Sequence, residues 1–190
     1  MQAAVNGRLI SVEDYLAGEE TSETRHEYAG GAVYAMAGAS KEHNLIALNI
    51  YTALRLGIRA PCRAFVSEVK VRLQALQEDI FYYPDVMVAC DPRDTHRLFS
   101  SYPKVLIEVS SPATERLDRR EKRWAYQTIE TLEECVIVSQ DRLEATLFRR
   151  AEDWTAEVFS GLNESLPLRS VALKLPLSMI YEGVSIAHTP

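Results

Sequence analysis

The chain has 190 residues, a net charge of −6, 47% hydrophobic residues and 25% charged residues. This length and composition are typical of one globular domain spanning residues 1–190, with enough apolar residues for a full core. No apolar run reaches the roughly 18 residues that a membrane-spanning helix needs, and residues 1–10 lack a signal-peptide pattern. We therefore expect a cytoplasmic protein without a membrane span. The acidic net charge argues against a protein that coats nucleic acid by charge alone.

The three cysteines, Cys62, Cys90 and Cys135, lie in or beside apolar runs. Their number is odd and no CxxC pair occurs, so the sequence predicts neither a disulfide framework nor a zinc site. We expect each cysteine to be a small buried hydrophobic residue.

Helix and strand patterns alternate in the first half of the chain. Ser11 is expected to begin a short helix, and Ser40 a longer one ending at Gly57, because serine hydroxyls accept from free N–H groups of a first helical turn. Gly30-Gly31 predicts a β-hairpin. Strands are expected at residues 62–66, 69–73 and 81–89.

The second half of the chain contains further strand patterns and one clear helix. The helix is expected at residues 114–128, begun by Thr114, with Leu117, Trp124 and Ala125 on its apolar face. Strands are expected at residues 105–109, 135–138, 143–149 and 154–159, and a closing helix at residues 175–182. This order of elements predicts an α/β fold, α+β-like in its hairpins, with a mixed central sheet.

Two acidic residues stand where core strands should be apolar. Asp85 lies in the strand-like run at residues 81–89, and Glu108 in the run at residues 105–109. An unpaired carboxylate buried in a strand costs on the order of several kcal/mol, so it needs a cation or a hydrogen-bond network. Two such groups on neighbouring strands are compatible if a divalent cation lies between them, and their oxygens suit Mg²⁺ or Mn²⁺. The alternative is that arginine or backbone N–H groups neutralise each carboxylate separately.

The Pro84-Asp85 pair, followed 23 residues later by Glu108, resembles the signature of the PD-(D/E)XK nuclease superfamily. The surrounding segments resemble its Uma-type family of restriction endonucleases over residues 11–150. The matching segments are Glu27-Tyr28 with Gly30-Gly31, His43, residues 65–71, Tyr83 to Val86, Ile107 to Pro112, and residues 118–126 with Lys122. The resemblance implies a restriction-endonuclease-like central sheet flanked by helices.

The resemblance also implies a set of site residues. Asp85, Glu108, Glu27 and the carbonyl of Val109 would bind Mg²⁺ or Mn²⁺. The superfamily usually places a lysine two residues after the glutamate, where this chain has Ser110. In the Uma-type family the following helix supplies that lysine, which is Lys122 here.

The residues alone leave alternatives open for two of these positions. Lys122 belongs to a charged run and is equally explained by a surface pair with Asp118, four residues away, a contact that contributes about 0.2–0.5 kcal/mol. Glu27 is equally explained as an exposed acid beside the hairpin. His43 is a lone histidine, which is more often structural than a ligand.

The function that the resemblance implies is metal-dependent hydrolysis of DNA phosphodiester bonds by an endonuclease. The alternative is a catalytically inactive module of the same fold that binds nucleic acid or protein, an interpretation that Ser110 and the acidic net charge favour. The apolar strands after Cys135 predict a homodimer, because exposed strand edges tend to pair.

Overall fold

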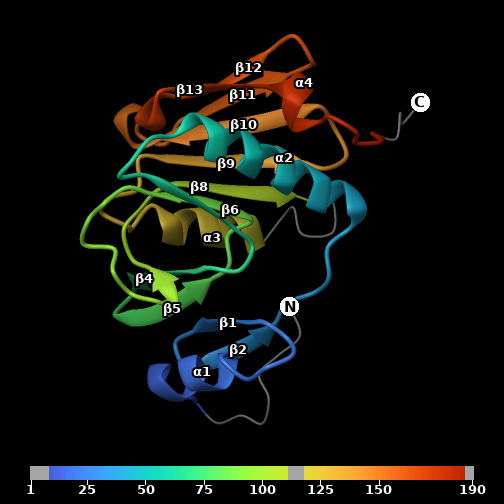
Figure 1. Ribbon diagram of the computed structural model, residues 1–190. Coiled ribbons are helices and arrows are strands. Elements are labelled where there is room, and N and C mark those ends of the chain that lie inside the picture. The colour runs from blue at the N-terminus through green and yellow to red at the C-terminus, as the bar shows by residue number, and fades with distance from the viewer. Residues whose placement is uncertain (1–8, 111–117, 187–190) are drawn as a thin grey trace.

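A computed structural model describes residues 9–110 and 118–186, and it shows two sheets stacked as two lobes (Figure 1). The six-stranded sheet has the order β11 (Ala156–Ser160), β10 (Glu144–Arg149), β9 (Glu134–Ser139), β8 (Pro103–Ser110), β6 (Val86–Ala89), β3 (Arg63–Val66). The five-stranded sheet has the order β2 (Ala32–Ala35), β1 (His26–Ala29), β5 (Glu78–Tyr82), β4 (Lys70–Ala75), β7 (Phe99–Ser100). Because β8 pairs with β9 in parallel and with β6 antiparallel, the predicted mixed sheet is confirmed.

Short helices and one small hairpin surround the two sheets. The α-helices are α1 (Val12–Glu19), α2 (Lys41–Gly57), α3 (Asp118–Tyr126) and α4 (Leu177–Ile180), and the 3₁₀ turns are η1 (Arg150–Glu152) and η2 (Arg169–Val171). The strands β12 (Ser165–Leu168) and β13 (Leu173–Pro176) form the hairpin. Among the helices of the described residues, none is long and apolar enough to cross a membrane.

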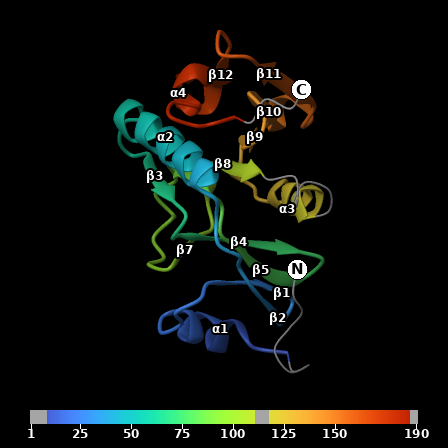
Figure 2. The same cartoon turned by 90° about the vertical axis from the view of Figure 1, so that its right-hand side faces the viewer.

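The larger core lies between α2 and one face of the six-stranded sheet. Ile46, Ile50 and Leu54 recur at helical spacing on α2, are completely buried, and pack in one cluster with Ile107 of β8 and Val86 of β6. The small hairpin and α4 extend this cluster. As Figure 2 shows, α2 runs across the strands on this side of the molecule.

The opposite face of the six-stranded sheet packs against α3 and strands of the second lobe. Met87 and Leu106 point to this face and form a cluster with Tyr126 of α3 and Val71 of β4. A third cluster, Tyr15, Tyr28, Phe81 and Phe99, lies between α1 and the five-stranded sheet. The two lobes are therefore joined by packed side chains.

The predicted helix starts and hairpin are confirmed. The Ser11 hydroxyl accepts from the N–H of Asp14, and the Ser40 hydroxyl accepts from the N–H of His43, each at 3.1 Å. Gly30 and Gly31 have φ values of 54° and 90°, which suit a tight hairpin turn. Thr114 and Leu117 lie outside the described residues.

The prediction of one strand over residues 81–89 was wrong. The chain leaves β5 at Tyr82 and enters β6 at Val86, and these two strands belong to different sheets. Pro84 stands at the break, where it has no N–H to donate to a sheet. The expected helix at residues 175–182 begins later, because residues 173–176 pair with β12 as a strand that the pattern did not predict.

The buried residue of α3 is also different from the one predicted. Trp124 is 67% exposed and does not belong to the core, whereas Tyr126 is completely buried. The face of α3 that meets the sheet carries Tyr126 and, one turn earlier, Lys122. Trp124 was expected on the core side of the helix because it is apolar. The side of α3 that meets the sheet carries Lys122 and Tyr126 instead.

The structure joins Cys62 and Cys90 in a disulfide, so the expectation of three unpaired cysteines was wrong. Cys62 directly precedes β3 and Cys90 directly follows β6, and the register of Arg63 opposite Ala89 brings them together. Cys135 is unpaired and buried, as predicted. Of the strands that follow it, β9 and β10 lie inside the sheet and β11 forms its edge.

Candidate active site

Asp85 and Glu108 lie side by side where β6 and β8 pair. Val86 of β6 pairs with Ile107 of β8 in the antiparallel register. Asp85, which precedes Val86, therefore lies opposite Glu108, which follows Ile107. Val86 and Ile107 point into the core under α2, and alternation along each strand directs Asp85 and Glu108 to the other face. The two acids thus sit on neighbouring strands, at the end of the sheet that lies near the second lobe.

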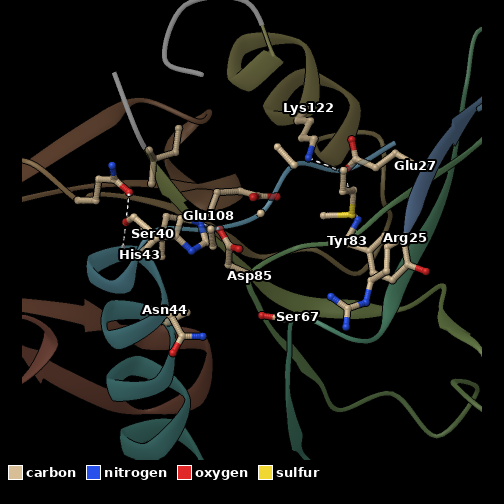
Figure 3. Close-up of a pocket in the computed structure, with 18 of the residues that line it drawn as sticks. Arg25, Glu27, Ser40, His43, Asn44, Ser67, Tyr83, Asp85, Glu108 and Lys122 are labelled. Carbon is tan, nitrogen blue, oxygen red and sulfur yellow. Dashed lines mark hydrogen bonds and ion pairs between the residues drawn. The ribbon is translucent and has the colours of Figure 1, made fainter. Parts of the chain in front are cut away.

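A cleft of about 640 Å³ opens over these two acids, and all the residues implied by the resemblance line it (Figure 3). Glu27 reaches it from β1 of the five-stranded sheet, and Lys122 from α3. His43 reaches it from the first turn of α2. Four elements that are far apart in sequence therefore contribute charged side chains to one space.

The carboxylate of Asp85 is held by two donors. Its Oδ2 accepts from the backbone N–H of Val109 at 2.7 Å and lies 3.2 Å from Nε2 of His43. Burial by itself would lower the pKa of His43, but the hydrogen bond and negative charge of Asp85 outweigh it, so this pKa is raised. The Val109 backbone also bonds His43. Asp85 and His43 therefore form a pair at the base of the cleft.

Glu108 has a strongly perturbed acidity. Burial raises its pKa to about 7, and the charge of Asp85 adds to this, while Lys122 and the Tyr126 hydroxyl act in the opposite direction. The Tyr126 hydroxyl donates to Oε1 of Glu108 at 2.6 Å. Burial, more than the negative charge of its neighbours, therefore makes the ionised form of Glu108 costly.

Lys122 forms an ion pair with Glu27, with its Nζ 2.5 Å from Oε1. The ammonium also lies 5.1 Å from the centre of the Tyr82 ring, which stabilises a cation. Burial would lower the pKa of Lys122, but Glu108 and Glu27 raise it well above its usual range. Its side chain is only 20% exposed. Lys122 is therefore a fixed charge within the cleft and not a solvated surface lysine.

The donor set fits a hard divalent cation in chemistry. Carboxylate oxygens are the preferred ligands of Mg²⁺ and Mn²⁺, and a cation would neutralise the ionised form of Glu108, whose pKa is raised mainly by burial and further by the charge of Asp85. As the side chains stand, however, no three acidic, histidine or cysteine side chains of the described residues are grouped closely enough to hold an ion. The reason is that Asp85, Glu108 and Glu27 each hold a different partner, respectively His43, Tyr126 and Lys122.

His43 was part of the resemblance but was not assigned to the site, and Tyr126 was not singled out. His43 was judged a structural histidine, but its place three residues after the capping Ser40 fixes it on the first turn of α2, facing the cleft. Tyr126 carried no signal in isolation. Its spacing of four residues from Lys122 places both on one helix face, and that spacing was the available clue.

Comparison with known proteins identifies the family to which this chain belongs. A family model described as "Putative restriction endonuclease" matches residues 12–179, which is most of the chain. The chain belongs to the Uma2 family. The resemblance drawn from Pro84-Asp85 and Glu108 is thereby confirmed.

Relatives of this Uma2 protein share its length. Two uncharacterized proteins of Synechocystis sp. are 33% identical over 180 residues and 27% identical over 172 residues, covering 93% and 87% of this chain and 93% and 96% of their own. A crystal structure from Anabaena variabilis, of "a putative nuclease belonging to DUF820", covers 93% of this chain and 99% of its own, with a TM-score of 0.73 at 18% identity. That likeness shows that the two chains share a fold.

Proposed function

We propose that this protein is an endonuclease that hydrolyses DNA phosphodiester bonds with the help of Mg²⁺ or Mn²⁺. The observation that carries the proposal is the convergence of Asp85, Glu108, Glu27 and Lys122 on one cleft. Membership of the Uma2 family supports a nuclease role. Three acids and one lysine lining the same cleft suit a reaction in which an anionic phosphate must be held and activated.

The acids would bind the cation, with Asp85 and Glu108 as the central ligands and Glu27 and the Val109 carbonyl as further ones. When bound, the cation supplies a Lewis acid for the phosphate and a water of lowered pKa. The chain's own acids fix where that charge is placed. For Glu27 to contribute, its carboxylate must leave Lys122, so the present ion pair holds both groups ready at the site.

Lys122 would neutralise charge that develops on the phosphate in the transition state. Glu108 and Glu27 raise its pKa and so keep the ammonium protonated at neutral pH, which favours an electrostatic role over that of general base. The residue therefore replaces the lysine that related nucleases carry on the strand. Ser110, which stands at that strand position, is 2% exposed and has no charge to offer.

His43 would hold Asp85 in place from the helix side. Its Nε2 contacts the same oxygen that accepts from the Val109 backbone, so this oxygen is fixed from two directions. The other carboxylate oxygen of Asp85 then remains for a cation. Together these contacts preorganise the ligand before substrate arrives.

A second candidate function is an inactive module of the same fold. Two observations favour it: the described residues hold no ready-made ligand group for an ion, and Ser110 stands where the strand lysine is usual. Such a module would bind nucleic acid or protein without cleaving it.

Cleavage of supercoiled plasmid in the presence of Mg²⁺ or Mn²⁺ separates the two candidates. Wild type is expected to nick and linearise the plasmid, and Asp85→Ala is expected to lose this activity while keeping its fold. Asp91→Ala is the matched control, because Asp91 is an acid that pairs with Arg93 in a loop outside the cleft. Cleavage that persists in Asp85→Ala would overturn the proposed site.

The predicted homodimer is kept as a proposal, with β11 as the strand that would pair. β11 is one of the two edge strands of the six-stranded sheet, and Val158 on it is 56% exposed. Such an edge presents unpaired backbone groups beside an apolar side chain. Sedimentation velocity at micromolar concentration tests it, and a purely monomeric species would rule it out.

A further inference from the structure

Within the part of the chain that the structure describes, the Tyr126 hydroxyl has one polar contact, and it is to the site. The side chain is completely buried, and its hydroxyl donates to Oε1 of Glu108 at 2.6 Å. A buried hydroxyl without a partner costs about 1–3 kcal/mol, so this bond fixes both ends of the pair. Because one oxygen of Glu108 is held in this way, its second oxygen is left to face a ligand in the cleft.

The ring of Tyr126 cannot easily turn away from Glu108. It packs edge-on against the Tyr82 ring, with centroids 5.9 Å apart and planes at 84°. Leu106 and Leu132, both completely buried, belong to the same cluster. Close packing of this kind leaves one rotamer for the ring, so the hydroxyl position is set by the core itself.

Tyr126 also shares a helix face with Lys122. Lys122 and Tyr126 are four residues apart on α3, so their side chains lie one above the other on a single helix face. A lysine on the strand next to Glu108 would be positioned by the strand. A lysine on a separate helix reaches the site only if that helix keeps one rotation about its own axis. The hydrogen bond from Tyr126 to Glu108 joins α3 to β8 and would hold that rotation.

We propose that Tyr126 is the positioning residue of this site, which orients Glu108 as a metal ligand and sets the rotation of α3 that delivers Lys122. The inference rests on the proposed function, because it takes Glu108 as a ligand of Mg²⁺ or Mn²⁺. It adds a residue that acts through two others and touches neither cation nor substrate. Partners of this kind, bonded behind a metal ligand, typically change metal affinity by about 10–100-fold when removed.

The test is Tyr126→Phe, which removes the hydroxyl and keeps the ring. The matched control is Tyr15→Phe, since Tyr15 is also buried and its hydroxyl also donates one bond of 2.6 Å, to the His26 carbonyl. We expect calorimetric titration with Mn²⁺ alone to show an affinity about 10-fold weaker or more in Tyr126→Phe and unchanged in Tyr15→Phe. We expect kcat for plasmid cleavage to fall with KM unchanged, whereas thermal unfolding should change similarly in both variants.

Failure of this inference and failure of the proposed function give different results. If wild type binds Mn²⁺ and cleaves DNA, but Tyr126→Phe matches Tyr15→Phe in both assays, the positioning role is overturned and the nuclease stands. If wild type binds Mn²⁺ without cleaving, and Tyr126→Phe binds it more weakly, the positioning role stands and the nuclease falls. If wild type binds no Mn²⁺, Glu108 is not a metal ligand and both are overturned.

Discussion

Lys122 and Glu27 form an ion pair although 95 residues separate them in the chain. Glu27 belongs to β1 of the five-stranded sheet, and Lys122 belongs to α3, which packs on the six-stranded sheet. Their contact at 2.5 Å therefore bridges the two lobes directly above Asp85 and Glu108. Lys122 of α3 thereby lies at the cleft, although Ser110 stands two residues after Glu108 on the strand.

Replacing Lys122 by Met should separate catalysis from metal binding. We expect kcat to fall by about 100-fold or more, because a preorganised charge at the reacting phosphate is lost. The affinity for Mn²⁺ should stay equal or become tighter, since the ammonium repels the cation and occupies Glu27. Plasmid cleavage and calorimetry measure the two quantities.

Lys104→Met is the control for this experiment, because Lys104 also pairs with a glutamate, Glu133, at 2.7 Å on the surface of the protein. The plasmid-cleavage activity of Lys104→Met should equal that of wild type. If Lys122→Met loses Mn²⁺ binding together with activity, Lys122 has a structural role and the assignment as a catalytic charge is wrong.

Glu108→Gln should change the pH dependence of stability in metal-free protein. The folded-state pKa of Glu108, about 7, lies above its ordinary value of 4.5, so the folded state holds an extra proton between these values. The resulting stabilisation is present below about pH 4.5 and is lost as pH rises through 7. Above pH 7 the glutamine variant should therefore be more stable than wild type, by about 3 kcal/mol, because each unit of pKa difference corresponds to about 1.4 kcal/mol.

The measurement is urea denaturation of both proteins with chelator at pH 5 and pH 8. The difference in free energy of unfolding between the two proteins should shrink at pH 5, where wild-type Glu108 is mostly protonated. With Mn²⁺ present, wild type should become more stable than Glu108→Gln, because a ligand that binds only the folded wild type stabilises it. Equal stability of the two proteins at pH 8 without metal would contradict the raised pKa of Glu108.

Trp124→Ala and Leu106→Ala should differ sharply in stability. Trp124 is 67% exposed, so we expect its removal to change the free energy of unfolding by about 0.5 kcal/mol or less. Leu106 is completely buried between β8 and α3, and its truncation should cost about 2–5 kcal/mol. Chemical denaturation of the two variants checks this. A large loss in Trp124→Ala would restore the core role that the sequence pattern suggested.

The sequence predicted what depends on local chemistry. The caps at Ser11 and Ser40, the Gly30-Gly31 turn and the strand around Glu108 each follow from a few neighbouring residues. Which chain segments share a sheet is a matter of long-range pairing. The break at Pro84 and the pairing of Cys62 with Cys90 depend on it, and no local pattern encodes it.

For the site, the sequence identified the acids because a carboxylate in an apolar strand is conspicuous. Asp85 and Glu108 stood out for that reason, and the family resemblance added Glu27 and Lys122. His43 was part of the resemblance but was judged structural, and Tyr126 was missed, because histidine and tyrosine are common in ordinary cores and surfaces. Their importance comes from the partners that the fold gives them, Asp85 and Glu108 respectively.

The most direct test of the account is to locate bound Mn²⁺ by anomalous diffraction in crystals of wild-type protein soaked in manganese chloride. We predict a peak in the cleft contacted by the carboxylates of Asp85 and Glu108, with Glu27 turned from Lys122 toward it, and no such peak in crystals of Asp85→Ala. Well-ordered crystals that bind Mn²⁺ elsewhere, or none in this cleft, would contradict the claim that these acids form a metal site.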